Sequence, residues 1–229
     1  MTMRLLLMAC LTSFAMSAQV KVAGKAKNVM MGVDLSPNIW LDSIVQPGVY
    51  GLGPVDDLQG EITIFDGAPY VSTLVNGEVV TAIDQHVKAP FFVYAQVDEW
   101  HEYTIEASVN GLRELQNVID ELGASSGLDG PFPFRVQLEN AYLNYHIIMR
   151  DLSEAKHSHE AHKKAKVHFE AASASAELLG FFSRDHEGVF THKGQFIHTH
   201  ILLSNPSVTG HLDDINVTGS MTIFLPRNM

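Results

Sequence analysis

Three histidines in the last part of the chain have the spacing of a metal site. His198 and His200 are two residues apart in an apolar run, and His211 follows eleven residues after His200. Alternate residues of a strand point to the same face, so we expect the first two imidazoles to lie side by side. The turn residues of SNPSVTG then let the chain fold back and bring His211 alongside. Three imidazoles that leave one coordination position open are typical of catalytic zinc.

A second group of histidines is an alternative metal site. Two of its members, His159 and His162, would share one face of a helix. Three lysines lie in the same segment, which favours a solvated polar helix over a metal site. The group consists of His157, His159, His162 and His168.

The composition is that of a globular protein. Of 229 residues, 46% are hydrophobic and 18% are charged, which excludes a disordered chain. The length suits one large domain or two small ones. The formal net charge of −11 argues against nucleic acid or an anionic membrane surface as a partner.

Residues 1–18 are predicted to be a signal peptide, with Arg4, an apolar run and then small residues up to Ala18. This run is too short to span a bilayer, and no later stretch has the roughly 20 apolar residues that a span needs. Cleavage near Ala18 would remove Cys10, the only cysteine. A lipoprotein acylated at Cys10 is the less favoured alternative, because only six residues precede its LMAC tetrapeptide. We therefore expect a periplasmic or secreted protein without disulfides.

The rest of the chain predicts an α/β fold (α+β-like) of two mixed β-sheet halves, residues 19–123 and 124–229, with few helices and the metal site on the second half. In the first half, strands around 62–64, 70–74 and 91–97 are separated by tight Asp-Gly and Asn-Gly turns, and a strand at 103–105 closes the sheet. A helix over 109–122 ends at Gly123. In the second half we expect a hairpin over 134–150 that turns at Glu139–Asn140, a polar helical segment at 151–168, and strands at 178–182, 196–203 and 220–225.

These motifs resemble the α-acetolactate decarboxylase family over essentially the whole mature chain. GVYGLGPVDDLQGEITIFDG is similar to the family's GDFGLGTF segment followed by LDGE and a strand that ends in DG. YTIEASVNGLRELQNVIDEL is similar to the family helix of the form LSKEELEALIDEL. The family also has His-x-His, ten intervening residues and then Gly-Gly-His-Val-Leu-Asp-Phe. Here the spacing is the same and the last part is Thr-Gly-His-Leu-Asp-Asp-Ile.

The resemblance implies a zinc-dependent carboxy-lyase that converts 2-acetolactate (2-hydroxy-2-methyl-3-oxobutanoate) to acetoin, in a fold of two sheet-based halves. By position, the zinc ligands would be His198, His200 and His211, and Glu61 would be the active-site glutamate. Arg150 is the candidate for the family's active-site arginine, although Asp-Leu-Ser-Glu here replaces the usual Thr-Val-Pro run after it. Arg135, expected on the partner strand of the same hairpin, is the next candidate.

General chemistry leads to a compatible mechanism. A 2-hydroxy-3-keto acid can chelate a Lewis-acid metal, and loss of carbon dioxide leaves charge on the ketone oxygen, where a cation stabilises it. Arg150 could hold the carboxylate or lie near this charge. Glu61 could orient the substrate hydroxyl or deliver the proton to carbon.

Two departures from the family pattern keep other functions open. No glutamate occurs in the 18 residues after His211, where the family has a second active-site glutamate, and Pro54 replaces a family threonine. Asp213 and Asp214 cannot simply replace that glutamate, because they lie on the His211 segment itself. The alternatives are a non-catalytic exported protein that binds zinc or a keto acid, and a structural or interaction protein that keeps only the fold. The sequence leaves open whether the chain forms a homodimer.

Overall fold

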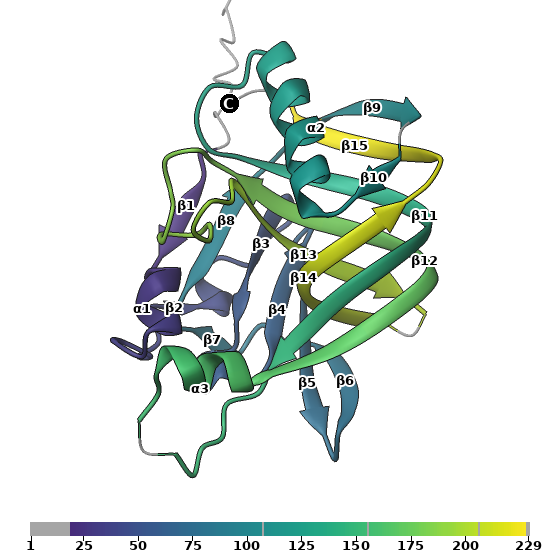
Figure 1. The fold of residues 1–229 in the computed structure, drawn as a ribbon. Coiled ribbons are helices and arrows are strands. Elements are labelled where there is room, and N and C mark those ends of the chain that lie inside the picture. The colour runs from purple at the N-terminus through teal and green to yellow at the C-terminus, as the bar shows by residue number, and fades with distance from the viewer. Residues whose placement is uncertain (1–18, 107, 155, 206, 228–229) are drawn as a thin grey trace, which may run out of the picture.

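The computed structural model describes residues 19–106, 108–154, 156–205 and 207–227. The predicted signal segment, residues 1–18, lies outside the described residues. Two β-sheets pack against each other, and helices lie at their edges (Figure 1). None of the helices in the described ranges has the length and apolar character needed to cross a membrane. The prediction of two sheets with few helices is confirmed.

The first sheet is antiparallel and has six strands. Its order is β1 (Lys21–Ala23), β8 (Phe92–Gln96), β3 (Val49–Pro54), β4 (Glu61–Phe65), β5 (Ala68–Val75) and β6 (Glu78–Ile83). Successive side chains of β4 point to opposite faces of the first sheet. Ile62 and Ile64 are fully buried in a small apolar cluster on one face, whereas Glu61 and Thr63 point toward the second sheet.

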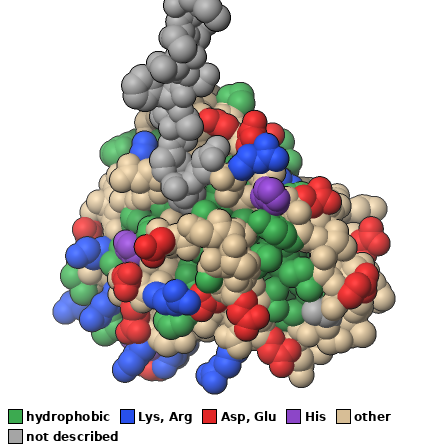
Figure 2. Space-filling view, turned by 90° about the horizontal axis from the view of Figure 1, so that it is seen from above, with side chains coloured by type: hydrophobic (Ala, Val, Ile, Leu, Met, Phe, Trp, Pro, Cys, Tyr) green, Lys and Arg blue, Asp and Glu red, His purple; other side chains and the backbone are tan. Residues whose placement is uncertain are grey.

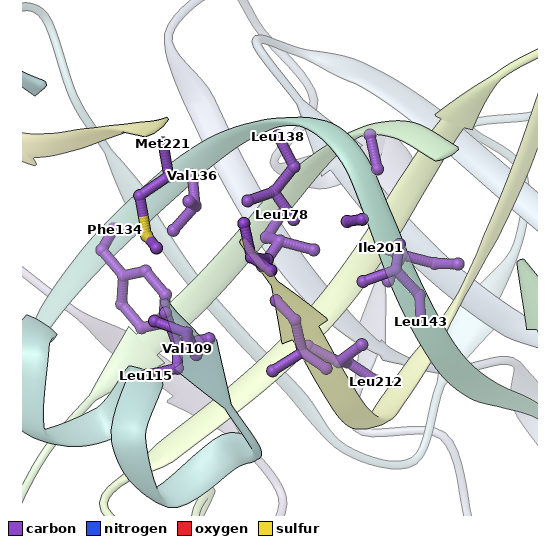
Figure 3. Close-up of a cluster of buried hydrophobic side chains, with 14 of the residues drawn as sticks. Val109, Leu115, Phe134, Val136, Leu138, Leu143, Leu178, Ile201, Leu212 and Met221 are labelled. Atoms are coloured by element: carbon purple, nitrogen blue, oxygen red, sulfur yellow. The ribbon is translucent and has the colours of Figure 1, made fainter. Parts of the chain in front are cut away.

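The second sheet has seven strands and closes on itself. Its order is β10 (Val109–Asn110), β14 (Ser207–Val217), β13 (Ile197–Ser204), β12 (Lys166–Phe182), β11 (Phe132–Ile148), β15 (Ser220–Pro226) and β9 (Trp100–Glu106). Because β11 also pairs with β14, the four long strands β11–β14 surround a hydrophobic core (Figure 3). Burial of each Leu, Ile or Phe there contributes roughly 1.5–3 kcal/mol, which makes this the stable platform of the molecule.

The remaining elements are short, apart from one helix. A two-stranded sheet pairs β2 (Ile39–Trp40) with β7 (Lys88–Ala89). The helices are α1 (Ala26–Met30), α2 (Leu112–Ser125) and α3 (His159–Lys164), with 3-10 turns at Leu41–Ser43 and Asp56–Leu58. α2 crosses one end of the second sheet in Figure 1, and its Leu115 and Ile119 enter the core.

Helix α2 extends past Gly123, which we predicted as its end. Gly123 lies inside the helix, where the ring of Phe132 packs closely against it. A Cβ at this position would be 2.6 Å from that ring, which accounts for the glycine. The helix stops instead at Gly127, whose φ of +75° favours glycine. There the Leu128 N–H donates to the Gly123 carbonyl (3.0 Å) and the Gly127 N–H to the Ala124 carbonyl (3.1 Å). These bonds satisfy carbonyls at the helix end in a Schellman motif.

Two sequence predictions about the strands are wrong. The strand at 103–105 does not close the first sheet, because β9 pairs with β15 of the second sheet. The chain therefore changes sheet between β8 and β9, before residue 123. The predicted hairpin at Glu139–Asn140 is one continuous strand, β11, in which Asn140 has a φ of +58°. Asn140 forms a β-bulge there, since asparagine tolerates the left-handed conformation better than most residues.

The bulge changes which side chains face the core. On β11, Val136 and Leu138 point inward before it, and Leu143 and Tyr145 do so after it. The register with β12 shifts a second time between residues 141 and 143 of β11, so the two strands return to their original pairing. Beyond both shifts, the even-numbered His146 and the side chains near it face the first sheet.

Acidic and basic side chains are interspersed over the face shown in Figure 2, with hydrophobic side chains between them. This is an ordinary solvated surface. The buried histidines and Glu61 lie inside the molecule, between the two sheets. There the outer face of the second sheet meets the first sheet through an apolar cluster that includes Leu52, Phe91 and Phe181.

Candidate metal centre

The β13–β14 hairpin brings the three predicted histidines together. His200 and His211 are direct partners across the hairpin, and His198 lies two residues along β13. The ring centroids of His198 and His211 are 4.8 Å apart, and those of His200 lie 5.5 and 5.6 Å from them. One nitrogen from each ring lies within 4.8 Å of the other two.

Hydrogen bonds around His200 determine its tautomer. The hydroxyl of Thr209 donates to the Ile201 carbonyl (2.9 Å), so its oxygen accepts from the Thr63 hydroxyl. Thr63 must then accept from Nδ1 of His200, at 3.0 Å. We assign the proton of His200 to Nδ1 from this network. Its Nε2 therefore carries the free lone pair, as in metal sites whose ligand histidines are oriented by a second hydrogen bond.

The three imidazoles fit a bound metal ion. Nε2 of His200 is buried and has no hydrogen-bond partner within the described residues. Nε2 of His198 and Nδ1 of His211 approach to 3.1 Å. Burial lowers the pKa of His200 to about 3 and the pKa values of the other two far below their usual range. Neutral imidazoles offer lone pairs at neutral pH, and a set of three nitrogens suits zinc.

Glu61 lies directly beside this group. Its Oε2 is 3.6 Å from Nε2 of His200, and the N–H of Ile148 on β11 donates to its Oε1 at 3.3 Å. The carboxyl is buried, and burial raises its pKa to about 8, while the Ile148 hydrogen bond and the charge of Lys166 oppose the rise. Burial therefore favours the protonated form of Glu61, which can donate a proton.

A cavity opens in front of these groups, with about 430 Å³ of empty space that includes part of the solvent opening. Pro54 is in its wall, so the replaced family threonine belongs to the site. The residues that line it include Pro54, Glu61, Phe91, His146, Ile148, His162, Lys166, His192, His198 and His211.

His146, which the sequence analysis did not single out, is the direct strand partner of His211, with ring centroids 4.7 Å apart. Its Nδ1 lies 2.8 Å from both oxygens of Asp213, and Nδ1 of His168 lies 3.1 Å from one of them. Burial lowers the pKa of His146, and Asp213 opposes this. Asp213 therefore holds His146 in place instead of facing the three ligands.

The alternative histidine group is divided by the structure. His157 and His162 contact each other, with Nε2 and Nδ1 at 3.2 Å, while His168 lies on β12 beside Asp213. Helix α3 is short and polar on its exposed side, but His162 is buried and lines the main cavity. Burial lowers the pKa of His162 to about 3 and that of His192, also in the cavity wall, to about 4.

The two predicted arginines point elsewhere. The guanidinium of Arg150 lies 3.4 Å from Asp57 and donates to the Glu154 carbonyl at 3.2 Å, and Arg150 is not among the described residues that line the cavity. Its backbone bonds with Leu58 and Gln59 instead fix the turn that precedes Glu61.

Arg135 is not on a partner strand of Arg150, because β11 is continuous. Its guanidinium packs over the rings of Phe65 and Phe224 and pairs with Glu177 at 3.3 Å. These contacts make Arg135 a packing residue between the two sheets.

Comparisons with known proteins agree with this fold. The sequence model of the family described as alpha-acetolactate decarboxylase matches residues 23–225. The solved alpha-acetolactate decarboxylase of Bacillus subtilis strain 168 is 18% identical, with a TM-score of 0.72 over 92% of this chain and 86% of that chain. The acetolactate decarboxylase of Bacillus subtilis subspecies spizizenii is 19% identical, with a TM-score of 0.71 over the same shares.

A third solved structure is a Staphylococcus aureus protein of unknown function that is similar to alpha-acetolactate decarboxylase. It is 13% identical, with a TM-score of 0.73 over 90% of this chain and 84% of that one. No curated protein matches the chain significantly. At these identities the solved structures establish the fold, and the family match establishes the ancestry.

Proposed function

The chain belongs to the alpha-acetolactate decarboxylase family, and on that premise we propose that it is a zinc-dependent enzyme that decarboxylates 2-acetolactate, or a close 2-hydroxy-3-keto acid, to acetoin. The observation that carries the proposal is the convergence of three neutral imidazoles, with the lone pair of His200 directed at Glu61. A small-molecule substrate suits this cavity, which is partly open to solvent.

His198, His200 and His211 would hold the metal ion, and the Thr63–Thr209 network would keep His200 in the required tautomer. A divalent cation held there would stabilise the negative charge that develops on the ketone oxygen of the substrate. Phe91 stacks on His198, with ring centroids 5.8 Å apart, and so fixes the orientation of this imidazole.

Glu61 is proposed to handle the proton. When the bond between C2 and the carboxyl carbon breaks, carbon dioxide leaves. The electron pair of that bond stays with C2 and is delocalised onto the ketone oxygen, giving an enediolate. One proton must then be added to C2 to yield acetoin. Glu61 is buried, which favours its protonated form, and it is fixed by the Ile148 N–H, so its Oε2 can deliver this proton.

A catalytic role for Arg150 stays a prediction. If it acts on the substrate, Arg150→Ala should retain the metal and lower turnover by roughly 10²-fold or more. If it only fixes the turn before Glu61, the loss should be smaller and should accompany a lower melting temperature.

We also propose export of the protein, on the evidence of residues 1–18. Mass spectrometry of protein from the native host should find an N-terminus near Ala18 or Gln19. Soluble protein that retains Met1 would contradict export, and an acyl group on Cys10 would favour the lipoprotein alternative.

The second candidate function is a non-catalytic protein that binds zinc or a keto acid in the same cavity. Pro54 in the cavity wall, at a position where the family has a threonine, supports it. Incubation of the zinc-loaded mature protein with racemic acetolactate separates the two. Acetoin and carbon dioxide above the uncatalysed rate support the enzyme, and tight zinc binding without acetoin supports the binding protein.

A further inference from the structure

Lys166 occupies a position in the cavity that the proposed reaction has not yet used. It is the first residue of β12, and its direct strand partner is Ile148, whose N–H holds Glu61. It lines both the main cavity and an adjoining pocket that shares His162, His192 and His211. We infer that Lys166 binds the carboxylate of the substrate, an inference that rests on the proposed function.

The ammonium group of Lys166 forms no ion pair with the described residues. Within the described residues, Lys166 is the one lysine or arginine that lines the main cavity, and it forms no salt bridge there. Two other cations nearby have partners, since Arg150 pairs with Asp57 and Lys163 pairs with Glu160. An unpaired ammonium group beside a small cavity is suited to an anionic ligand.

The nearest carboxylates already have partners. Both oxygens of Asp213 accept from His146, and one of them also from His168. Glu61 accepts from the Ile148 N–H and faces His200 with its other oxygen. The charge of Lys166 lowers the pKa values of both carboxyls, and no salt bridge joins it to either of them within the described residues.

This position predicts a particular kinetic effect. The substrate enters with a full negative charge on its carboxylate and loses that charge when neutral carbon dioxide forms. A cation paired with the carboxylate therefore stabilises the bound substrate more than the later transition state. Removal of the Lys166 charge should therefore raise KM without lowering kcat.

The test is calorimetric binding of 2-hydroxy-2-methylpropanoate, an unreactive hydroxy acid, to the zinc-loaded protein. Lys166→Met and Lys166→Gln should each weaken binding by roughly 10- to 100-fold, the range of a hydrogen bond to a charged group. Lys166→Arg should stay within a few-fold of the parent. Lys164→Met, which removes an exposed lysine two residues away, is the matched control and should bind like the parent.

Zinc content and melting temperature are measured for every variant, and the two charge-removing variants guard against a folding defect in one of them. Unchanged hydroxy-acid affinity in a folded, zinc-containing Lys166→Met or Lys166→Gln protein would overturn the inference. If the parent makes no acetoin, the decarboxylase proposal fails, but the binding comparison still decides the role of Lys166. For an active parent, a loss confined to kcat would also contradict it.

Discussion

Two walls of the cavity are built in different ways. The hairpin wall consists of β13–β14, with His198 and His211 lining the cavity and His200 buried beside them. The bulged wall consists of His146, Ile148 and Lys166 on β11–β12. In the hairpin wall, side chains converge through local spacing and a tight return of the chain. In the bulged wall, they face the cavity because the extra residue at Asn140 turns the side chains that follow it on β11 to the other face, although β11 and β12 pair in the same register before and after it.

The two walls should therefore differ in how they respond to substitutions. Residues two apart on a regular strand keep their face under most substitutions, so the hairpin wall depends mainly on its own side chains. An extra residue within a strand turns every following side chain of that strand to the other face. The bulged wall therefore depends on Asn140 and on the register shifts between residues 138 and 143.

The largest expected effect is on the hairpin wall. His200→Ala should abolish stoichiometric zinc binding and with it any decarboxylation, because two imidazoles remain. The loss of affinity should exceed the roughly 10- to 100-fold that removal of a supporting residue costs. Metal analysis after dialysis measures it, with His101→Ala, an exposed histidine on β9, as the control. Full zinc content in His200→Ala would show that another cluster holds the metal.

Glu61→Gln tests the group that joins the two walls. The amide keeps the shape but cannot deliver a proton, so the variant should retain zinc and lose turnover by roughly 10²–10⁴-fold. Steady-state assays of acetoin formation check this. Turnover equal to that of the parent would remove Glu61 from the mechanism.

Thr63→Val tests whether the hydrogen bond that orients His200 contributes to zinc affinity while all three proposed ligands are kept. The variant removes the acceptor of the His200 Nδ1 proton, and zinc affinity should fall by roughly 10- to 100-fold. Competition with a chelator of known affinity measures the change. Thr73→Val, on the neighbouring strand β5 and away from His200, should leave the affinity unchanged. An equal loss in both variants would mean that general destabilisation is responsible.

Asn140→Val probes the bulged wall with the smallest expected effect. A β-branched residue at a φ of +58° should lower the free energy of unfolding by roughly 1–2 kcal/mol. Asn140→Gly, which accepts this conformation, should change it by less than about 1 kcal/mol. Urea denaturation measures both. If the valine variant is as stable as the parent, the bulge does not depend on the residue type at position 140.

The sequence was sufficient for the hairpin wall because everything needed lies within 14 residues, from His198 to His211. It was insufficient for the bulged wall, since Glu139–Asn140 suits a hairpin turn and a bulge equally well. Taken as a turn, it hides that His146 pairs with His211. A prediction of one continuous strand with a bulge would have placed His146 beside His211. No local pattern in the sequence distinguishes such a bulge from a hairpin turn.

The fold shows the same division. Short strands bounded by Asp-Gly and Asn-Gly turns were predictable from local residues, as β4 and β5 confirm. The pairing of β9 with β15 joins residues more than 110 positions apart, as in Ser220 with Glu106, and no short-range signal specifies it. Arg150 was matched by a motif, yet its side chain direction depends on contacts with Asp57 and Glu154.

The most direct test of the account is the position of zinc in crystals of the mature protein, located by anomalous scattering at the zinc edge. The account predicts one strong peak among the imidazoles of His198, His200 and His211, facing Glu61. A strong peak at His146, His168 and Asp213 instead, whose ligand atoms also lie within 4.8 Å of one another, would contradict it. So would crystals that bind no zinc at the three histidines.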